Sequence, residues 1–326
     1  MLLIKLIEKW TNGQPFNFLG LFKQIKVSLN AFEICFVPHF YLYMHLYISI
    51  LLWVDCCMFR FKFNDFKTAT NAHVHKGIEK KMHITRTTTT NGRLGNQIIR
   101  NLAISFIAKK HDLKIEYCNK ALIESLGINL FSGTHFHHDI MKLTDDNYFN
   151  VYNSTNLNFA LDPNSNFFQT KEITNFIYKY LQTEDVKCNI IDKNPYKIRY
   201  NANNDLFIHI RLTDVANKNP GINYYLNAIK NIKYDELYIS TDDKKHAIVL
   251  NLLKLFPNAK LVQTNEIATF QFASTCKHVV LSHGSFSAVI GYLSFFSDVY
   301  YPEYDLKNLW YGDMFSIDGW NKLSVV

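Results

Sequence analysis

Polar residues that could do chemistry follow three short apolar stretches of the sequence. His209 and Arg211 end the stretch DLFIHIR, with Asp214 close behind; Ser240–Asp243 follow LYI, and Ser282–Ser285 follow VVL. An Arg guanidinium is a planar fork of donors suited to phosphate oxygens. A Ser at the start of a helix adds a hydroxyl to free backbone N–H groups, which favour an anion. The three stretches together predict a site for an anionic ligand.

Each of these residues also has a purely structural interpretation. Arg211 could pair with Asp214 as a structural ion pair, and Ser285 could be a plain N-cap. Asp242 could accept hydrogen bonds from a ribose, or it could cap the helix KKHAIVL. Capping and ligand binding are compatible, and the occurrence of three such strand ends favours a ligand.

The elements that must position these residues alternate regularly after residue 205. Helical stretches such as YYLNAIKNI, KKHAIVLNLLKLF and SAVIGYLSFF separate five apolar strands: DLFIHIR, DELYIST, NAKLVQT, KHVVLS and SDVYYP. Strands that alternate with helices predict a parallel sheet with helices on both faces. Ligands bind such sheets at the carboxyl ends of the strands, where the polar residues are expected.

A separate strand and helix open the part before residue 205. HITRTTTT (83–90) is β-branched and runs through NGRLGNQ (91–97) into a helix with apolar residues at helical spacing: Ile98, Leu102, Phe106 and Ile107. The stretch LKIEY predicts a further strand and KEITNFIYKYLQ a further helix. We expect residues 82–204 to form an N-terminal domain and residues 205–326 a C-terminal domain.

Residues 1–81 differ from the rest and are expected to be dispensable for chemistry. The uncharged run 34–54 has about the length of a membrane span, roughly 20 residues. Pro38 and two histidines inside the run argue against a span, so both interpretations stay open. A spanning run would make the protein membrane-anchored through a Golgi-type signal anchor, and otherwise we expect it to be cytoplasmic. Residues 61–81 resemble a polar linker.

Composition limits the remaining classes of function. The net charge of +7 is spread along the chain without a basic arm for nucleic acid, which leaves a small anionic ligand as the expected partner. Six cysteines without a CxxC pair indicate neither a zinc site nor a disulfide framework. The cluster HFHHD (135–139) lacks the spacing of a metal site, so we expect no metal.

Four motifs in order carry a resemblance to a known family. GRLGNQ (92–97), HIRLTD (209–214), YISTDD (238–243) and CKHVVLSHGSFSAVIGYLS (276–294) are similar to the motif set of the α1,2-fucosyltransferases, glycosyltransferase family 11. The resemblance spans residues 83 to about 320. It implies a GT-B-like α/β fold, in which two Rossmann-like domains with parallel sheets face a cleft. Residues 82–204 would then be the acceptor-side domain and residues 205–326 the nucleotide-sugar-binding domain. It also implies inverting, metal-independent transfer of fucose from GDP-fucose to a glycan, most often a terminal β-galactoside, with no cofactor.

The resemblance also implies roles for single residues. Arg211 would neutralise the β-phosphate as GDP departs, and Asp214 is the local candidate for a catalytic base unless it only orients Arg211. Asn96 would approach the sugar nucleotide, and Phe286 would pack beneath it. Asp242 is included as the residue that could bind a ribose. The expected donor-binding residues are therefore Asn96, His209, Arg211, Asp242, Ser285 and Phe286.

Two departures from the family pattern keep alternatives open. The family's HxRRGD reads HIRLTD here, so Leu212 stands where a second Arg is usual. An acidic residue that reads guanine is replaced by Thr269, although Glu266 could substitute for it. The first alternative is a GT-B transferase that uses another nucleotide sugar. The second is a non-catalytic protein that binds a sugar nucleotide or a glycan.

Overall fold

The structure is a computed structural model that describes residues 82–90, 92–303 and 312–324. Residues 79–326 form one compact unit. The predicted membrane span 34–54 and linker 61–81 lie outside the described residues. Within the described part of the chain, no helix has both the length and the apolar character needed to cross a membrane.

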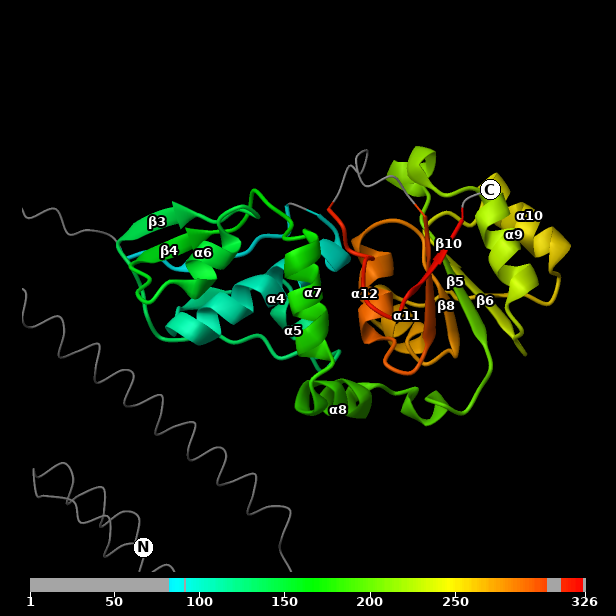
Figure 1. Cartoon of the computed structure of the whole chain (residues 1–326), viewed down its shortest axis with the longest axis horizontal. Helices are drawn as coiled ribbons and strands as arrows, with labels where there is room; N and C mark the ends of the chain where they lie inside the picture. The colour runs from blue at the N-terminus through cyan, green and yellow to red at the C-terminus, as the bar shows by residue number, and fades with distance from the viewer. Residues whose placement is uncertain (1–81, 91, 304–311, 325–326) are drawn as a thin grey trace, which may run out of the picture. The chain divides into compact units, whose positions relative to one another are not determined.

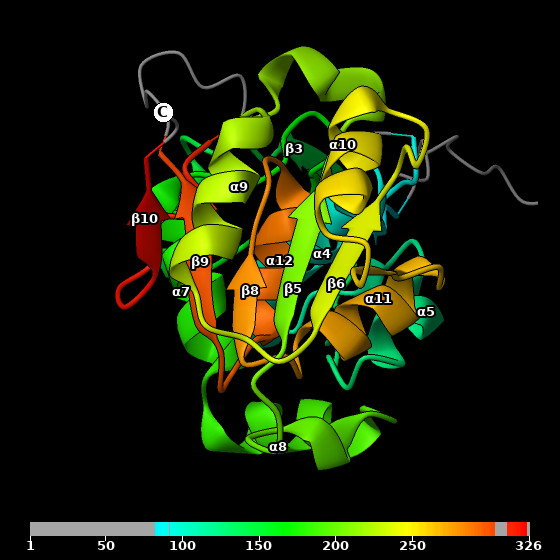
Figure 2. The ribbon, with the colours of Figure 1, turned by 90° about the vertical axis from the view of Figure 1, so that its right-hand side faces the viewer.

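A six-stranded parallel sheet forms the C-terminal part of this unit (Figures 1 and 2). Its strands are β5 (Leu206–Ile210), β6 (Leu237–Thr241), β7 (Lys260–Leu261), β8 (His278–Val280), β9 (Asp298–Pro302) and β10 (Asn321–Leu323). The spatial order is β10-β9-β8-β5-β6-β7. The chain therefore adds β6 and β7 on one side of β5, and then β8, β9 and β10 on its other side. This reversal between β5 and β8 is a topological switch point, where doubly wound sheets bind ligands.

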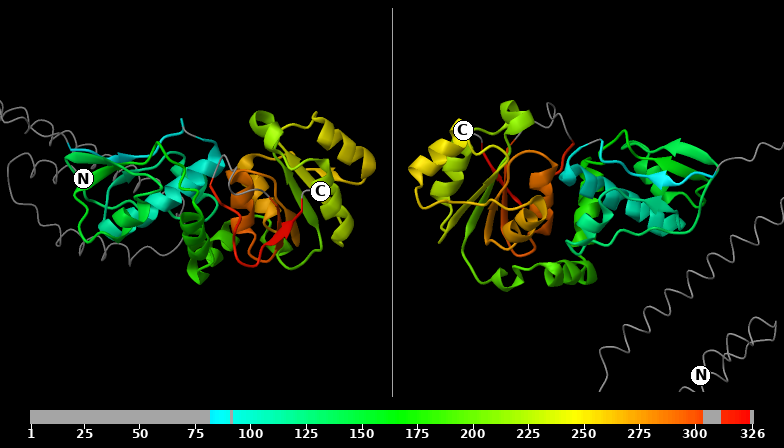
Figure 3. Two further views of the ribbon diagram at one scale, coloured as in Figure 1. Left: turned by 45° about the horizontal axis from the view of Figure 1, so that its top comes forward. Right: turned by 180° about the vertical axis from the view of Figure 1, so that it is seen from behind.

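Helices cover both faces of this sheet. Figures 2 and 3 show α9 (Ile222–Asn231) and α10 (Ala247–Leu255) on one face, and α11 (Glu266–Ala273) and α12 (Ser285–Leu293) on the other. Every residue of β5 is buried as a result. Leu206, Ile208 and Ile210 pack with α9 and α10. Because side chains alternate along a strand, His209 points to the opposite face, toward α12.

The N-terminal part of the unit contains shorter strands. β1 (Thr85–Arg86) pairs in parallel with β2 (Ile115–Glu116), and β3 (Asp139–Lys142) pairs in parallel with β4 (Phe159–Asp162). The helices of this part are α4 (Leu94–His111), α5 (Lys120–Glu124), α6 (Tyr148–Asn153), α7 (Lys171–Leu181) and α8 (Glu184–Lys193). Two 3₁₀ segments, Lys197–Arg199 and Thr213–Lys218, flank β5 in the chain.

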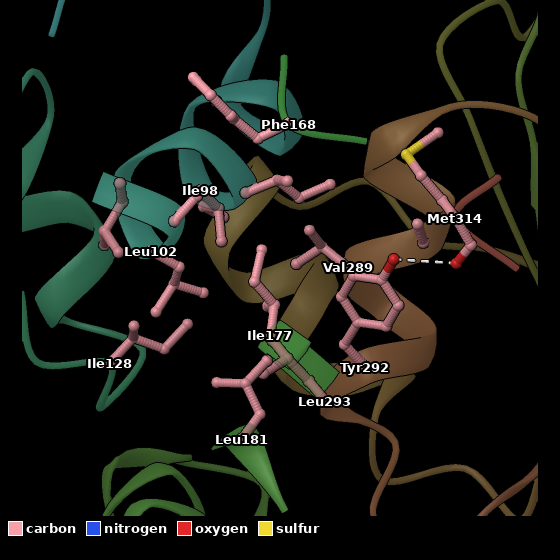
Figure 4. Packing of buried hydrophobic residues seen from close by; sticks show 14 of the residues in the cluster. Ile98, Leu102, Ile128, Phe168, Ile177, Leu181, Val289, Tyr292, Leu293 and Met314 are labelled. Atoms are coloured by element: carbon pink, nitrogen blue, oxygen red, sulfur yellow. Dashed lines mark hydrogen bonds between the residues drawn. The ribbon is translucent and has the colours of Figure 1, made fainter. Parts of the chain in front are cut away.

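One hydrophobic core joins α4 and α7 to α12 (Figure 4). Ile98 and Leu102 of α4 pack with Ile177 of α7 and with Val289 of α12, all at most 1% exposed. Tyr292 of α12 is equally buried and donates a hydrogen bond from its hydroxyl to the Met314 carbonyl at 2.8 Å. The helix α4, which follows the glycine-rich loop, is thereby fixed against α12, the helix at the end of the last motif.

The predicted class, α/β with parallel sheets, is confirmed. The apolar face predicted for α4 is confirmed at Ile98, Leu102 and Ile107, whereas Phe106 is only partly buried and packs edge-on against Phe176. The stretch HITRTTTT forms a strand over two residues only. The boundary expected between residues 204 and 205 stays a prediction.

Candidate functional site

A pocket of about 710 Å³ lies at the switch point of the sheet. Its lining comes from the carboxyl ends of β5, β6 and β8, from the start of α4, and from the segments around residues 145 and 168. A volume of this size suits a nucleotide or sugar-nucleotide ligand, since ligand pockets typically measure about 300–1,000 Å³. All of the predicted donor-binding residues line this pocket: Asn96, His209, Arg211, Asp242, Ser285 and Phe286.

Arg211 is held between two carboxylates at the end of β5. Its Nη1 donates to Asp242 Oδ2 at 2.7 Å, and its Nη2 donates to Asp214 Oδ1 at 2.5 Å. The side chain of Arg211 is 15% exposed, whereas that of Asp214 is 62% exposed. The structural ion pair is therefore present, and its carboxylate partner lies largely in solvent within a 3₁₀ segment. An anionic ligand could displace Asp214 more easily than the better-buried Asp242.

A second guanidinium reaches the same carboxylates from the start of α4. Arg93 Nη2 lies 2.7 Å from Asp214 Oδ1 and 3.5 Å from Asp242 Oδ2. The sequence reading assigned no role to Arg93, although its place in the glycine-rich loop ahead of a helix was a signal. Two Arg side chains from distant segments thus share two carboxylates, and the pocket holds a second positive charge besides Arg211.

Leu212, which stands where the family motif usually has a second Arg, occupies an apolar position. Its side chain is fully buried in the core between the sheet and α9 and α10, where an Arg side chain would place its charge among apolar groups. The next residue, Thr213, keeps a polar role and donates from its hydroxyl to Asp242 Oδ2 at 2.7 Å.

Asp242 does not cap the helix that follows it, so that interpretation is wrong. Its Oδ1 accepts a hydrogen bond from the Leu212 amide at 2.8 Å. The N-cap of α10 is instead His246, whose Nδ1 accepts from the Ile248 amide at 3.3 Å. The helix begins later in the chain than its apolar pattern indicated. Asp242 instead holds the loop after β5 through its hydrogen bond from the Leu212 amide. A contact with a ribose stays a prediction.

His209 is a buried, neutral imidazole in the floor of the pocket. Its Nδ1 lies 2.6 Å from Ser287 Oγ on α12, and the Ser287 hydroxyl also accepts from the Ser282 amide at 3.1 Å. Burial lowers the pKa of His209 to about 4, with a smaller opposing effect from Asp242. At neutral pH the ring therefore contributes a fixed dipole and no charge.

The start of α12 faces the pocket through Ser285. Gly284 is the N-cap of this helix at φ 89°, and Ser285 is its first helical residue. The interpretation of Ser285 as an N-cap is therefore wrong. Its hydroxyl makes no hydrogen bond within the described part of the chain, and the first amides of α12 lie beside it. A hydroxyl next to free helix N–H groups is suited to an anion.

The glycines of GRLGNQ let the α4 start approach the pocket closely. Gly92 has φ 89°, and a Cβ there would collide with the Asn96 side chain. A Cβ on Gly95 would lie 2.6 Å from the Phe286 amide nitrogen, because α4 and α12 touch at their N-termini. The loop thus requires glycine for its conformation at one position and for close packing at the other.

Asn96 is oriented by a residue far along the chain. Its Oδ1 accepts a hydrogen bond from Gln169 Nε2 at 2.7 Å, and both residues line the pocket. The amide Nδ2 of Asn96 makes no hydrogen bond within residues 82–90, 92–303 and 312–324. This orientation is compatible with the predicted contact between Asn96 and a sugar nucleotide.

The other end of the pocket is aromatic. Phe286 stacks on Phe270 with ring centroids 4.2 Å apart and lies 5.1 Å from the His209 ring. Thr269 lines this end, but its hydroxyl already donates to the Asn265 carbonyl at 2.9 Å. Glu266, at the start of α11, lines the same end and is exposed. Both residues considered for base recognition thus lie at the pocket.

The cluster HFHHD is remote from this chemistry. None of its residues lines the pocket. The Nδ1 atom of His135 lies 3.7 Å from Asp112 Oδ2. Among the residues that the structure describes, no three His, Cys, Asp or Glu side chains are grouped to hold a metal ion.

In comparisons with known proteins, this chain matches solved structures of glycosyltransferases. No protein-family model and no curated protein matches the sequence. The structure of the α1,6-fucosyltransferase NodZ soaked with GDP-fucose matches with a TM-score of 0.39 and 12% identity, over 64% of this chain and 91% of that chain. NodZ from Bradyrhizobium matches with a TM-score of 0.32 and 15% identity, over 51% of this chain and 61% of that chain.

The heptosyltransferase WaaC of E. coli, with ADP-2-deoxy-2-fluoro heptose, matches with a TM-score of 0.35 and 10% identity. The match covers 72% of this chain and 90% of that chain. The fold of this chain is α/β with parallel sheets. We base the function proposed below on the residues of the pocket and on the motif resemblance.

Proposed function

We propose that this protein is a glycosyltransferase that moves fucose from GDP-fucose to a glycan acceptor. The observation that carries the proposal is the pair of guanidinium groups, Arg93 and Arg211, at the switch point of a doubly wound sheet. Beside them lies the start of α12 with the Ser285 hydroxyl. Two cations and a helix N-terminus match the charge of a nucleoside diphosphate. The motif resemblance supplies fucose and guanine as the remainder of the donor.

In the proposed reaction the diphosphate replaces Asp214 between the two Arg side chains. An acceptor hydroxyl attacks the anomeric carbon opposite the phosphate, which inverts the configuration. The bond between the anomeric carbon and the phosphate oxygen breaks, and its electron pair stays with GDP. Arg211 and Arg93 stabilise the charge that develops on the β-phosphate. Because two guanidinium groups are available for this charge, we propose that the reaction needs no metal ion.

The linkage and the acceptor follow from the resemblance alone. We propose an α1,2 linkage to a terminal β-galactoside on that ground. Incubation of the full chain with GDP-fucose and lactose tests this, with GDP release and the product linkage as readouts. Formation of fucosyl-lactose with another linkage would keep the transferase and reject the α1,2 assignment. A product with retained configuration would contradict the inverting mechanism.

A second candidate is a transferase that uses another nucleotide sugar, and Thr269 is the observation that favours it. A neutral hydroxyl that already donates to a backbone carbonyl is a poor partner for the two donors of guanine. Glu266 would have to take that role for the GDP assignment to hold. Selective binding of UDP or ADP over GDP would favour this candidate, and nucleotide binding without any turnover would favour the non-catalytic one.

A further inference from the structure

One wall of the pocket belongs to none of the four motifs. Asp145, Phe167 and Gln169 line the pocket from the N-terminal part of the chain, outside the strands and helices predicted there. Phe167 keeps 41% of its surface exposed, and Asp145 is half-buried. An aromatic ring, a carboxylate and an amide are groups that recognise a sugar, since a sugar ring has an apolar C–H face and hydroxyl edges.

The three side chains are held by a backbone conformation that a bulky residue seldom adopts. Phe168 has φ 56°, in the left-handed region, and its side chain is fully buried in the core (Figure 4). Its amide donates to Asp145 Oδ1 at 3.0 Å. The buried ring and this hydrogen bond together fix the segment from residue 167 to residue 169. Conformations of this kind cluster at functional sites.

Gln169 connects this wall to the donor side of the pocket. Its Nε2 donates to Asn96 Oδ1 at 2.7 Å, and Asn96 lies one residue beyond Gly95, which touches the start of α12. The Gln169 backbone carbonyl also packs directly under Gly312, where a Cβ would collide with it. The wall is therefore continuous with the residues proposed to hold the sugar nucleotide.

Asp145 has one oxygen free for a ligand. Oδ1 accepts the Phe168 amide, while Oδ2 makes no hydrogen bond within the part of the chain that the structure describes. Burial raises the pKa of this carboxyl; the hydrogen bond from the Phe168 amide opposes this in part, and the Asp146 charge adds a smaller increase. A carboxylate of raised pKa accepts a proton more readily than an ordinary one.

We infer that Asp145, Phe167 and Gln169 form the acceptor subsite, in which a sugar ring lies on Phe167 and its reacting hydroxyl faces Asp145 Oδ2. This inference rests on the proposed function. As the acceptor oxygen bonds to the anomeric carbon, its proton passes to Asp145, and the bond to GDP breaks with its electron pair leaving on GDP. Asp145 then releases the proton to water. The base is thus placed on the acceptor side, whereas Asp214 pairs with the two Arg side chains.

The test uses the full chain with GDP-fucose and four probe sugars, the methyl glycosides of β-galactose, β-glucose, β-N-acetylglucosamine and α-mannose. We expect Asp145→Asn to lower kcat by about 100-fold or more, because the amide keeps the bond to Phe168 but cannot take a proton. In the unmodified protein kcat should rise with pH through the pKa of Asp145, and this rise should disappear in Asp145→Asn. Phe167→Ala should raise KM for the acceptor about tenfold with little change in kcat.

Matched controls separate these effects from damage to the fold. Glu172→Gln changes an exposed carboxylate outside the pocket, and Phe159→Ala removes a ring that is as exposed as Phe167 and also lies outside the pocket. Both should leave kcat and KM unchanged, and all four variants should bind GDP as the unmodified protein does. Failure of the unmodified chain to bind GDP would reject the proposed function itself.

GDP binding with no transfer to lactose or to any of the four probe sugars would reject the transferase and the acceptor subsite together. Transfer whose kcat is unchanged in Asp145→Asn and whose acceptor KM is unchanged in Phe167→Ala would overturn the acceptor subsite while the proposed function stands.

Discussion

At the residue scale, the site depends on charges brought together from distant parts of the chain. Arg93 and Arg211 converge on Asp214 and Asp242, and the charges of the four groups balance one another. We expect a bound diphosphate to take over hydrogen bonds that Asp214 now accepts. The affinity for GDP should consequently depend on both Arg side chains.

We predict that Arg93→Ala and Arg211→Ala each weaken GDP binding by about 10- to 100-fold. This range corresponds to the loss of one charge-assisted hydrogen-bonded contact, about 1.5–3 kcal/mol. Calorimetric titration with GDP measures it. The control is Arg86→Ala, since Arg86 forms an exposed ion pair with Glu116 outside the pocket. Unchanged affinity in Arg93→Ala would show that Arg93 is not the second cation.

Two buried histidines predict how stability depends on pH. Burial lowers the pKa of His209 and of His283 to about 4, whereas an unfolded chain binds these protons near the ordinary value of about 6.5. The unfolded state therefore binds more protons between these pH values. The free energy of unfolding should fall as pH decreases from about 6.5 toward 4, by at most about 3 kcal/mol per group.

Urea unfolding of the protein and of His209→Gln at a series of pH values measures this dependence. The variant should lose part of the dependence below pH about 6.5 and none above it. An identical pH profile for the two proteins would contradict a neutral His209 in the native state.

At the scale of elements, the contact between the starts of α4 and α12 builds the pocket. We predict that Gly95→Ala lowers the free energy of unfolding by about 1–3 kcal/mol, because the new Cβ would lie 2.6 Å from the Phe286 amide. Nucleotide binding should weaken too, since Phe286 and Ser285 would shift. Chemical denaturation measures the change, and the exposed Lys109→Ala on the same helix should stay within about 0.5 kcal/mol. A Gly95→Ala variant as stable as the unmodified protein would exclude this close contact.

Some strands and helices of the fold could be predicted from the sequence, and others could not. Five strands of the large sheet and the helices α4, α7, α9, α10 and α12 were predicted from the spacing of apolar residues. This spacing is regular because each of these elements is buried on one or two faces. The alternative interpretations of Asp242 and Ser285 as N-caps were wrong, since α10 begins at Ala247 with His246 as its N-cap and α12 has Gly284 as its N-cap. Strands β3, β4 and β10 were not predicted: each is short, and β3 and β10 are largely exposed.

Part of the site could not be predicted for a different reason. Arg211 and Ser285 were found because the carboxyl ends of neighbouring parallel strands meet at one edge. The position of Arg93 depends on how α4 packs against α12, and that of Asp145 on the left-handed Phe168. Such tertiary contacts leave no local periodic signal.

At the scale of the whole molecule, residues 79–326 form one compact unit with a core shared by α4, α7 and α12. We predict that a protein of residues 79–326 folds cooperatively by itself and binds GDP as the full chain does. Thermal unfolding followed by circular dichroism, together with calorimetric titration, checks this. A chain of these residues that aggregates, or that binds GDP much more weakly, would show that residues 1–78 contribute to the fold or the site.

The measurement that tests the central claim most directly is calorimetric titration of the full chain with GDP, GDP-fucose, UDP and ADP in the presence of a chelator. We expect GDP and GDP-fucose to bind without metal, and UDP and ADP to bind weakly, because two guanidinium groups take the diphosphate and Glu266 is available for guanine. Preference for UDP or ADP would contradict the fucose donor, and binding of none of the four would contradict a nucleotide-sugar site at the switch point.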